Sequence, residues 1–265
     1  MPRLTLPSGP VLRYEDTDPT GAADLPVVVL SHGLLMDHSM FDLQVAALRE
    51  SYRCVTWDQR AHGGTTYDGG PWSFWDSATD LVALLDALTV ERAVLVGMSQ
   101  GGFLSLRAAL AHADRVAGLV MLSSQAGQED PAAAPLYQQL VDDWAEHGSN
   151  DETLAFVASL ILGDGVEHAT WQQRWVEQPR EHARRALVPL LSREDLSDRL
   201  GELTCPVLVV HGTADLAIPV ERARAVADGV VDGRGLVLVD GGSHAANLSH
   251  PDEVSAALLE FLADL

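Results

Sequence analysis

One serine in this sequence lies in a pattern that could make it a nucleophile. Ser99 is the centre of the run Gly97-Met98-Ser99-Gln100-Gly101, which follows an apolar stretch and precedes a helical pattern. Between a strand and a helix, G-x-S-x-G is typical of a tight turn that exposes a serine hydroxyl, because glycine removes the side chains that would clash. The bare pattern also occurs by chance, so the flanking strand and helix carry the prediction.

A serine hydroxyl becomes a good nucleophile only when a histidine removes its proton, and an acid must hold that histidine in the right tautomer. Of the ten histidines, His244 and His250 follow the last apolar run, where the base is expected. His244 lies in a glycine-containing loop directly after that run. His250 precedes Pro251 and is typical of a helix start. We therefore predict His244 as the base.

The acid is predicted at Asp215, in the loop that follows the apolar run 207–210. The alternative interpretation of Asp215 is a turn or capping residue, a common role of aspartate. The position after the apolar run 119–122 offers two serines instead of an acid, and Asp240 lies too close to its own run. Asp215 is therefore the preferred partner of the histidine.

Two backbone N–H groups are candidate donors to a developing oxyanion. The run 27–30 ends in Ser31-His32-Gly33-Leu34, and a glycine bend there could aim the N–H of Leu34 at a substrate carbonyl. The N–H of Gln100 lies at a helix N-terminus, where it could face the same oxygen.

The elements that must position these residues follow a regular order. Short β-branched runs alternate with helical patterns, which predicts an α/β fold with a mostly parallel, twisted sheet and helices on both faces. Residues 4–6 and 11–14 predict an edge hairpin. The predicted strands are 27–30, 53–57, 93–96, 119–122, 207–210 and 236–239. The predicted helices are 77–88, 102–113, 220–227 and 254–262.

Residues 125–203 break this alternation, because their pattern is helical and no strand is evident. A segment of this length is expected to be a structured functional element rather than a bare loop. We predict a core of residues 1–124 and 204–265 and a helical cap of residues 125–203.

Several side chains are candidates to line a substrate pocket under this cap. These candidates are Leu35, Trp144, Trp171 and Trp175. Tryptophans at helical spacing more often pack in a core, which is the alternative for the last three. Arginines of the same segment could receive an anionic substrate, although a solvated helix face explains them more simply. They are Arg174, Arg180, Arg184 and Arg185.

Together these segments resemble the α/β-hydrolase superfamily. The His32-Gly33 turn, residues 58–63 and the loops around Ser99, Asp215 and His244 stand in its order, in which the acid and then the histidine follow the serine. The whole chain is similar, most weakly in the cap, to the capped esterase, lactonase and cofactor-free haloperoxidase branch, particularly to 3-oxoadipate enol-lactonase-like hydrolases.

The resemblance implies an α/β-hydrolase fold with an inserted helical cap, a triad of Ser99, Asp215 and His244, oxyanion donors at Leu34 and Gln100, and no cofactor. Two positions depart from the family's pattern. Ala61 stands where a glycine is usual, and Gln100 stands where methionine or leucine is common. A polar side chain at position 100 would lie beside the nucleophile and could tune the choice of substrate.

The predicted reaction is hydrolysis of a small-molecule carboxylic ester or lactone through an acyl-enzyme. A serine at this turn argues against epoxide hydrolases and haloalkane dehalogenases, which use aspartate there. The same triad could support perhydrolysis or carbon–carbon bond hydrolysis, so both remain alternatives. A ligand-binding receptor on a hydrolase scaffold is the alternative from a different class.

The composition limits the partners of this chain of 265 residues. A formal net charge of -21 argues against a nucleic-acid partner. No apolar run reaches the roughly 18–20 residues of a membrane span, and no signal peptide is evident. Two cysteines, Cys54 and Cys205, fit a reducing cytoplasm.

No metal-ligand spacing or glycine-rich phosphate loop is present. The absence of lysine excludes a lysine base, and a homodimer is left open.

Overall fold

The computed structural model describes residues 2–265, and its centre is an eight-stranded sheet. The strand order is β1-β2-β4-β3-β5-β6-β7-β8, with parallel neighbours from β4 to β8. The strands are β1 (Arg3–Thr5), β2 (Val11–Asp16), β3 (Val27–Ser31), β4 (Arg53–Trp57), β5 (Ala93–Met98), β6 (Val116–Leu122), β7 (Val207–Gly212) and β8 (Gly233–Val239). The predicted mostly parallel sheet is confirmed. The predicted hairpin forms as β1 and β2, and β2 also pairs antiparallel with β4.

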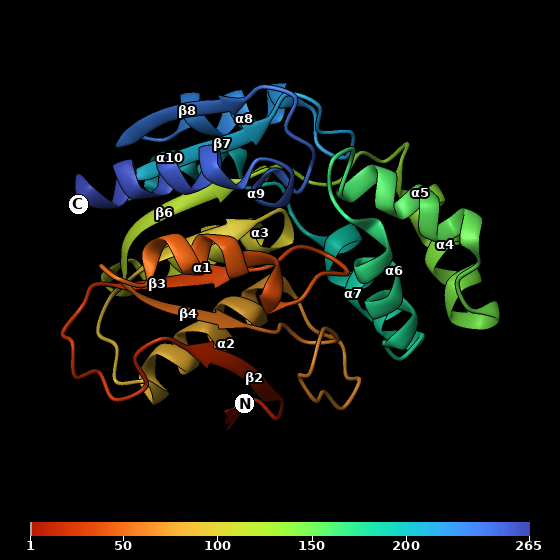
Figure 1. Cartoon of the computed structure of the whole chain (residues 1–265), viewed down its shortest axis with the longest axis horizontal. Coiled ribbons are helices and arrows are strands. Elements are labelled where there is room, and N and C mark those ends of the chain that lie inside the picture. Colours follow the sequence, from red (N-terminus) through yellow and green to blue (C-terminus); the bar gives the residue numbers. More distant parts are fainter. Residues whose placement is uncertain (1) are drawn as a thin grey trace.

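Helices cover both faces of the sheet, as Figure 1 shows. Because successive residues of a strand point to opposite faces, neighbouring valines join different buried clusters. Val29 packs in one cluster with Leu81 of α2, and Val28 packs in the other with Leu258 of α10. The core helices are α1 (Asp42–Leu48), α2 (Phe74–Ala87), α3 (Gln100–Ala111), α8 (Val220–Gly229), α9 (Ala246–Ser249) and α10 (Pro251–Ala263). Short 3₁₀ turns are η1 (His38–Phe41), η2 (Ala113–Arg115) and η3 (Ser197–Glu202).

Helix α2 begins three residues earlier than its apolar spacing predicts. Ser73 accepts a hydrogen bond from the N–H of Asp76, and the Asp76 carboxylate accepts one from the N–H of Ser73. This reciprocal pair satisfies two N–H groups that a helix start otherwise leaves without partners. The polar cap, rather than the first leucine, therefore sets the start of the helix.

The segment between β6 and β7 is helical. Its helices are α4 (Ala134–His147), α5 (Asp151–Ile161), α6 (His168–Glu177) and α7 (Glu181–Ser192). Figure 1 shows them grouped beyond one end of the sheet, on the right. The N–H of Ala245 donates to the carbonyl of Ile161 over 2.8 Å, which joins α5 to the loop after β8. Within residues 2–265, no helix is both long enough and apolar enough to cross a bilayer.

The two cysteines are free and buried. Burial raises the pKa of Cys54 to about 12 and that of Cys205 to about 11. Both groups therefore stay protonated at neutral pH and behave as small apolar side chains.

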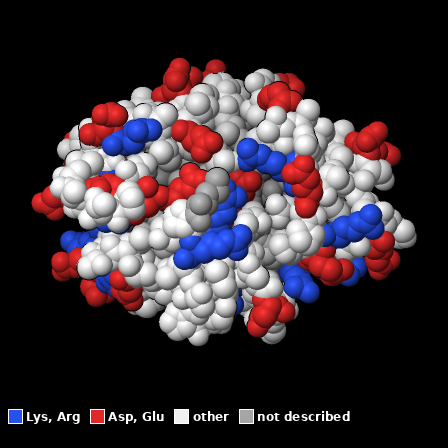
Figure 2. All heavy atoms as spheres, turned by 60° about the horizontal axis from the view of Figure 1, so that its bottom comes forward, with Lys and Arg blue, Asp and Glu red and all other residues white. Residues whose placement is uncertain are grey.

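Charged side chains are distributed over the surface rather than gathered in one tail. Figure 2 shows acidic and arginine side chains interspersed on the face that it views. Some of them pair, as Arg115 does with Asp86 at 2.7 Å and Arg234 does with Asp232 at 2.7 Å. Exposed pairs of this kind contribute little to stability, so the charge acts mainly on solubility and on the choice of partners.

Candidate active site

Ser99 lies in a strained turn between β5 and α3. Its backbone has φ 50° and ψ −115°, a conformation that costs a non-glycine residue about 1–3 kcal/mol. Hydrogen bonds hold it there: the N–H of Ser99 donates to the carbonyl of Leu122 over 2.9 Å, and the hydroxyl of Ser124 donates to the carbonyl of Ser99 over 2.8 Å. The neighbouring strand β6 and its following loop therefore fix the conformation of the turn.

Glycine is required on both sides of Ser99 because backbone approaches closely there. A Cβ atom at Gly97 would overlap the carbonyl of Gly101, and one at Gly101 would overlap the carbonyl of Ser31. Backbone atoms cannot move aside as a flexible side chain can. The two glycines of the sequence pattern are thus explained by packing of the turn against β3 and α3.

Gly101→Ala is expected to destabilise the protein, because the added methyl group meets the backbone of β3. Overpacking of this kind costs about 1–3 kcal/mol, which corresponds to a fall in melting temperature of roughly 2–4 °C per kcal/mol. Thermal unfolding measures the effect. Gly201→Ala is the matched control, since a Cβ atom at Gly201 meets nothing within 4 Å. Equal melting temperatures for the two variants would refute this account of the turn.

His244 and Asp215 lie together at the same edge of the sheet. They follow β8 and β7, which are parallel neighbours, so the loops after these strands lie side by side. The Nδ1 atom of His244 lies 2.8 Å from Oδ2 of Asp215. The other carboxylate oxygen accepts hydrogen bonds from the N–H groups of Ala217 and Ile218 over 2.8 and 2.9 Å. Asp215 is thereby oriented toward the imidazole.

The electrostatics of this pair favour an ionised acid. Burial alone would raise the pKa of Asp215, but the facing His244 and the hydrogen bond from Ile218 N–H outweigh burial and hold the pKa below its ordinary value. An ionised carboxylate accepts a hydrogen bond from Nδ1–H of His244, which leaves Nε2 unprotonated and able to accept a proton. This is the tautomer that a general base needs.

A second histidine, His211, lies beside the acid and has no role predicted from the sequence. Its Nε2 donates to the carbonyl of Ile218 over 2.9 Å and lies 3.4 Å from Oδ2 of Asp215. Burial lowers the pKa of His211, so the ring is neutral and supports the loop without adding charge. The clue in the sequence is its position at the end of β7, four residues before Asp215.

Ser99 and His244 line one pocket, here called the Ser99 pocket, which encloses about 800 Å³ of empty space counted out to its mouth. Leu34 and Leu35 line it from the turn after β3. The core and the helices α4, α5 and α7 supply further apolar side chains. Among them are Met98, Phe103, Tyr137, Phe156, Leu160 and Leu187.

The tryptophans expected to line a substrate pocket lie outside the Ser99 pocket. Trp144 and Trp175 line a neighbouring pocket that shares Leu35 with it. Trp171 belongs to the residues of neither pocket in the described chain; it is buried, with the guanidinium of Arg174 4.8 Å from its ring centroid. Packing between helices, the alternative considered for these residues, accounts for Trp171.

The side chain of Gln100 points away from the Ser99 pocket, which differs from the sequence expectation. Its Nε2 donates to Oε1 of Gln59 over 3.0 Å, and Nε2 of Gln59 donates to the carbonyl of His32 over 2.6 Å. Gln100 is 2 % exposed and is not among the described residues that line the pocket. Through these hydrogen bonds the Gln100 side chain connects the turns after β3, β4 and β5.

The same buried network reaches the turn that carries Leu34. The N–H of Leu35 donates to Nε2 of His62 over 3.2 Å, and Nδ1 of His62 donates to the carbonyl of Arg60 over 2.8 Å. Burial lowers the pKa of His62 to about 3, which keeps the ring neutral and able to accept from Leu35. His62 and Gln59 therefore hold the backbone next to Leu34, a role that the run 58–63 alone does not reveal.

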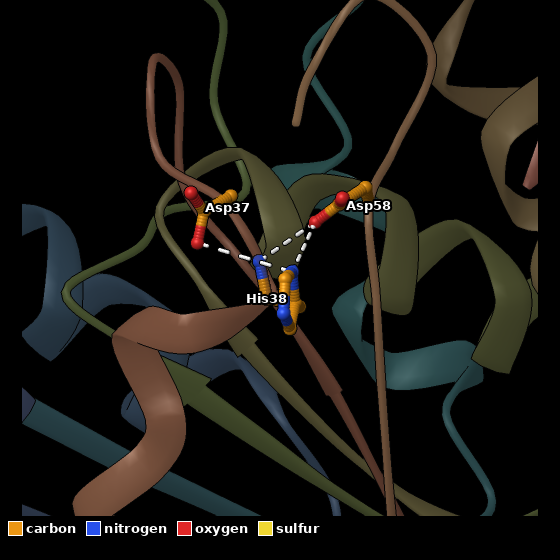
Figure 3. Close-up of side chains that lie close together, drawn as sticks. All are labelled: Asp37, His38 and Asp58. Carbon is orange, nitrogen blue, oxygen red and sulfur yellow. Dashed lines mark hydrogen bonds and ion pairs between the residues drawn. The ribbon is translucent and has the colours of Figure 1, made fainter. Parts of the chain in front are cut away.

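A cluster of two carboxylates and an imidazole lies near this network. Figure 3 shows Asp37 and Asp58 on either side of His38. The Nδ1 atom of His38 lies 2.8 Å from Oδ1 of Asp58, and Asp37 pairs with Arg174 at 3.1 Å. Burial would raise the pKa of Asp58, but other contacts, the hydrogen bond with His38 first among them, lower this pKa to about 2. These groups already satisfy one another, so they stabilise the turns and connect α6 to the core.

Comparison with known proteins agrees with this fold. The family model described as alpha/beta hydrolase fold matches residues 26–251, so the chain belongs to the α/β-hydrolase-fold family. The enol-lactonase from Burkholderia xenovorans LB400 superposes with a TM-score of 0.89 at 25% identity, over 99% of this chain and 100% of that one. A thermophilic esterase from Thermogutta terrifontis gives 0.88 at 25% identity, over 99% and 98%. The 3-oxoadipate enol-lactonase 1 of Acinetobacter baylyi is 26% identical over 252 residues, 88% of this chain and 87% of that protein. The resemblance derived from the sequence is confirmed.

Proposed function

We propose that this hydrolase cleaves a carboxylic ester or a lactone through an acyl-enzyme formed on Ser99. The observation that carries the proposal is the 2.8 Å contact between His244 and Asp215 at the pocket that Ser99 and His244 share. The strained turn at Ser99 supports it further, because such strain is typical of a nucleophile held ready for attack. The similarity to an enol-lactonase and an esterase supports the type of bond.

In this mechanism the Oγ atom of Ser99 attacks the substrate carbonyl while Nε2 of His244 takes its proton. Asp215 holds the imidazole and stabilises its charged form. The N–H groups of Leu34 and Gln100 donate to the oxyanion, and each such donor typically contributes about 3–4 kcal/mol. His244 then protonates the leaving oxygen, and a water molecule activated by the same histidine releases the acid.

We also propose that residues 125–203 serve as a cap over a core of residues 1–124 and 204–265. Side chains from α4, α5 and α7, among them Tyr137, Phe156 and Leu187, support this division because they line the Ser99 pocket together with residues of the core. A cytoplasmic setting is proposed on the sparse and unpaired cysteines.

The purified protein is expected to hydrolyse p-nitrophenyl acetate and butyrate, and a fluorophosphonate is expected to stop turnover by labelling Ser99. Release of p-nitrophenol measures the first result, and mass spectrometry of peptides locates the label. A serine activated to attack carbonyls is also the kind of nucleophile that displaces fluoride from this reagent.

Two controls sharpen this experiment. Heat-unfolded protein shows the background hydrolysis, and Ser99→Ala shows whether labelling is specific to this serine. If the protein shows no turnover and Ser99 is not labelled, the proposed enzyme is contradicted. Tight ligand binding without turnover would favour a receptor on the same scaffold.

A further inference from the structure

The Ser99 pocket offers an apolar surface with a single carboxylate. Of the described residues that line it, Glu129 is the one acidic side chain, and none is an arginine. The side chains around it include Phe103, Leu190 and Tyr137. A substrate that reaches Ser99 is therefore surrounded mainly by apolar side chains and by one carboxylate.

The arginines of the cap face elsewhere. Arg174 and Arg180 line the neighbouring pocket, and Arg184 pairs with Asp142 at 2.7 Å on the outside of α4. Arg185 is likewise absent from the described lining of the Ser99 pocket. A substrate that ends in a carboxylate would thus find no guanidinium among the described residues that line the Ser99 pocket.

Glu129 is held by an arginine that lies behind the pocket wall. Both terminal nitrogens of Arg193 lie 3.3 Å from Oε2 of Glu129. The guanidinium is 4.2 Å from the ring centroid of Phe103 and also donates to the carbonyl of Gly127 over 3.1 Å. Arg193 is 5 % exposed and does not line the described pocket, so Glu129 is the member of this pair that borders the pocket.

The position of Glu129 at the edge of the pocket also makes binding of an anionic substrate unfavourable. Glu129 also lines an open groove on the outer surface, together with Gln128 and Pro131. It therefore lies between the Ser99 pocket and solvent. A charged acyl chain would be brought close to Glu129 while it loses water, and both effects oppose binding of an anion.

We propose that the Ser99 pocket accepts uncharged, apolar acyl groups and that Glu129 determines this specificity by rejecting acyl groups that end in a carboxylate. The inference rests on the proposed function, since it concerns the substrate class of the same site. This specificity distinguishes the chain from a lactonase whose product is a dicarboxylate. Discrimination arises from a repulsive group as well as from the favourable apolar surface.

The test compares three p-nitrophenyl esters, two of which have acyl chains of the same length. The valerate and the glutarate monoester share a five-carbon acyl chain that ends in a methyl group or a carboxylate, and the methyl ester of the glutarate adds size without charge. We expect kcat/KM for the anionic ester to be at least about tenfold below that of its methyl ester. Similar values for the charged and uncharged glutarates would overturn the inference.

The variant Glu129→Gln assigns the effect to this residue, because glutamine keeps a hydrogen-bond acceptor for Arg193. The preference for the methyl ester over the anionic ester is expected to shrink at least about fivefold. Asp130→Asn is the matched control: it removes the same charge one residue away, outside the described pocket lining, and should leave the preference unchanged. An unchanged preference in Glu129→Gln would refute the role of Glu129.

Two further results keep the outcomes distinct. If Glu129→Gln does not fold, the double variant Glu129→Met with Arg193→Met removes the buried pair without leaving one charge unpaired, and the same loss of preference is expected. If none of the three esters is hydrolysed and Ser99 is not labelled, the proposed function itself fails. Hydrolysis of all three at equal rates leaves the proposed function intact and refutes only the specificity.

Discussion

Replacing Ser99 with alanine is expected to lower kcat for p-nitrophenyl butyrate by about 10⁴-fold or more, since no other group can form the acyl-enzyme. The protein should fold as before, because alanine fits the strained turn as well as serine does and the backbone hydrogen bonds to Leu122 and Ser124 remain. Steady-state kinetics and thermal unfolding measure the two effects separately.

The matched control for this substitution is Ser105→Ala. Ser105 is a fully buried serine on α3 that is not among the described residues lining the Ser99 pocket. Its replacement also removes one hydroxyl from the same helix, so a general effect of serine loss would appear in both variants. Wild-type activity in Ser99→Ala would assign the nucleophile elsewhere, and equal losses in both variants would indicate a structural effect.

The turn at Ser99 could be predicted from the sequence because its determinants are local. Gly97 and Gly101 lie within two residues of the serine, and β5 and α3 flank it directly. The strands were also predictable, since a buried parallel strand has a short β-branched run as its sequence pattern, and this pattern does not depend on which strands lie next to it. The differences in bounds arise where polar contacts extend an element, as the pair of Ser73 and Asp76 does for α2.

The direction of the Gln100 side chain could not be predicted in the same way. Its partner Gln59 lies 41 residues away in the chain and comes close only because β4, β3 and β5 are neighbours in the sheet. A polar residue next to a nucleophile can point into the pocket or beneath it. The order of the strands brings Gln59 within reach of this side chain, and a single sequence does not contain that order explicitly.

The lining of the substrate pocket was the least predictable part of the site. Trp171 and Trp175 are four residues apart on α6, yet Trp175 reaches a pocket while Trp171 packs under Arg174. Glu129 has no distinguishing pattern in the sequence, and its importance depends on Arg193, which is 64 residues further along. The helices of residues 125–203 pack by shape and charge against residues far away in the sequence. Local periodicity therefore predicts that these helices exist but not which of their faces border the Ser99 pocket.

Assignment of the base depends on two histidines six residues apart that have different surroundings. His244 contacts Asp215 at 2.8 Å and lines the Ser99 pocket, whereas Nδ1 of His250 contacts the hydroxyl of Ser249 at 2.9 Å. His250 lies at the start of α10 and is not among the described residues of the pocket. The two positions therefore form a natural matched pair for substitution.

His244→Ala is expected to lower kcat by about 10³-fold or more, whereas His250→Ala should leave kcat within about threefold of the wild type. Without an imidazole at position 244, the proton of Ser99 has no acceptor, although the fold retains the loop around Asp215. Added imidazole should restore part of the activity of His244→Ala and none in Ser99→Ala, a result that structural damage would not produce. Steady-state kinetics with and without imidazole measure this, and equal losses in the two histidine variants would show that His244 is not the base.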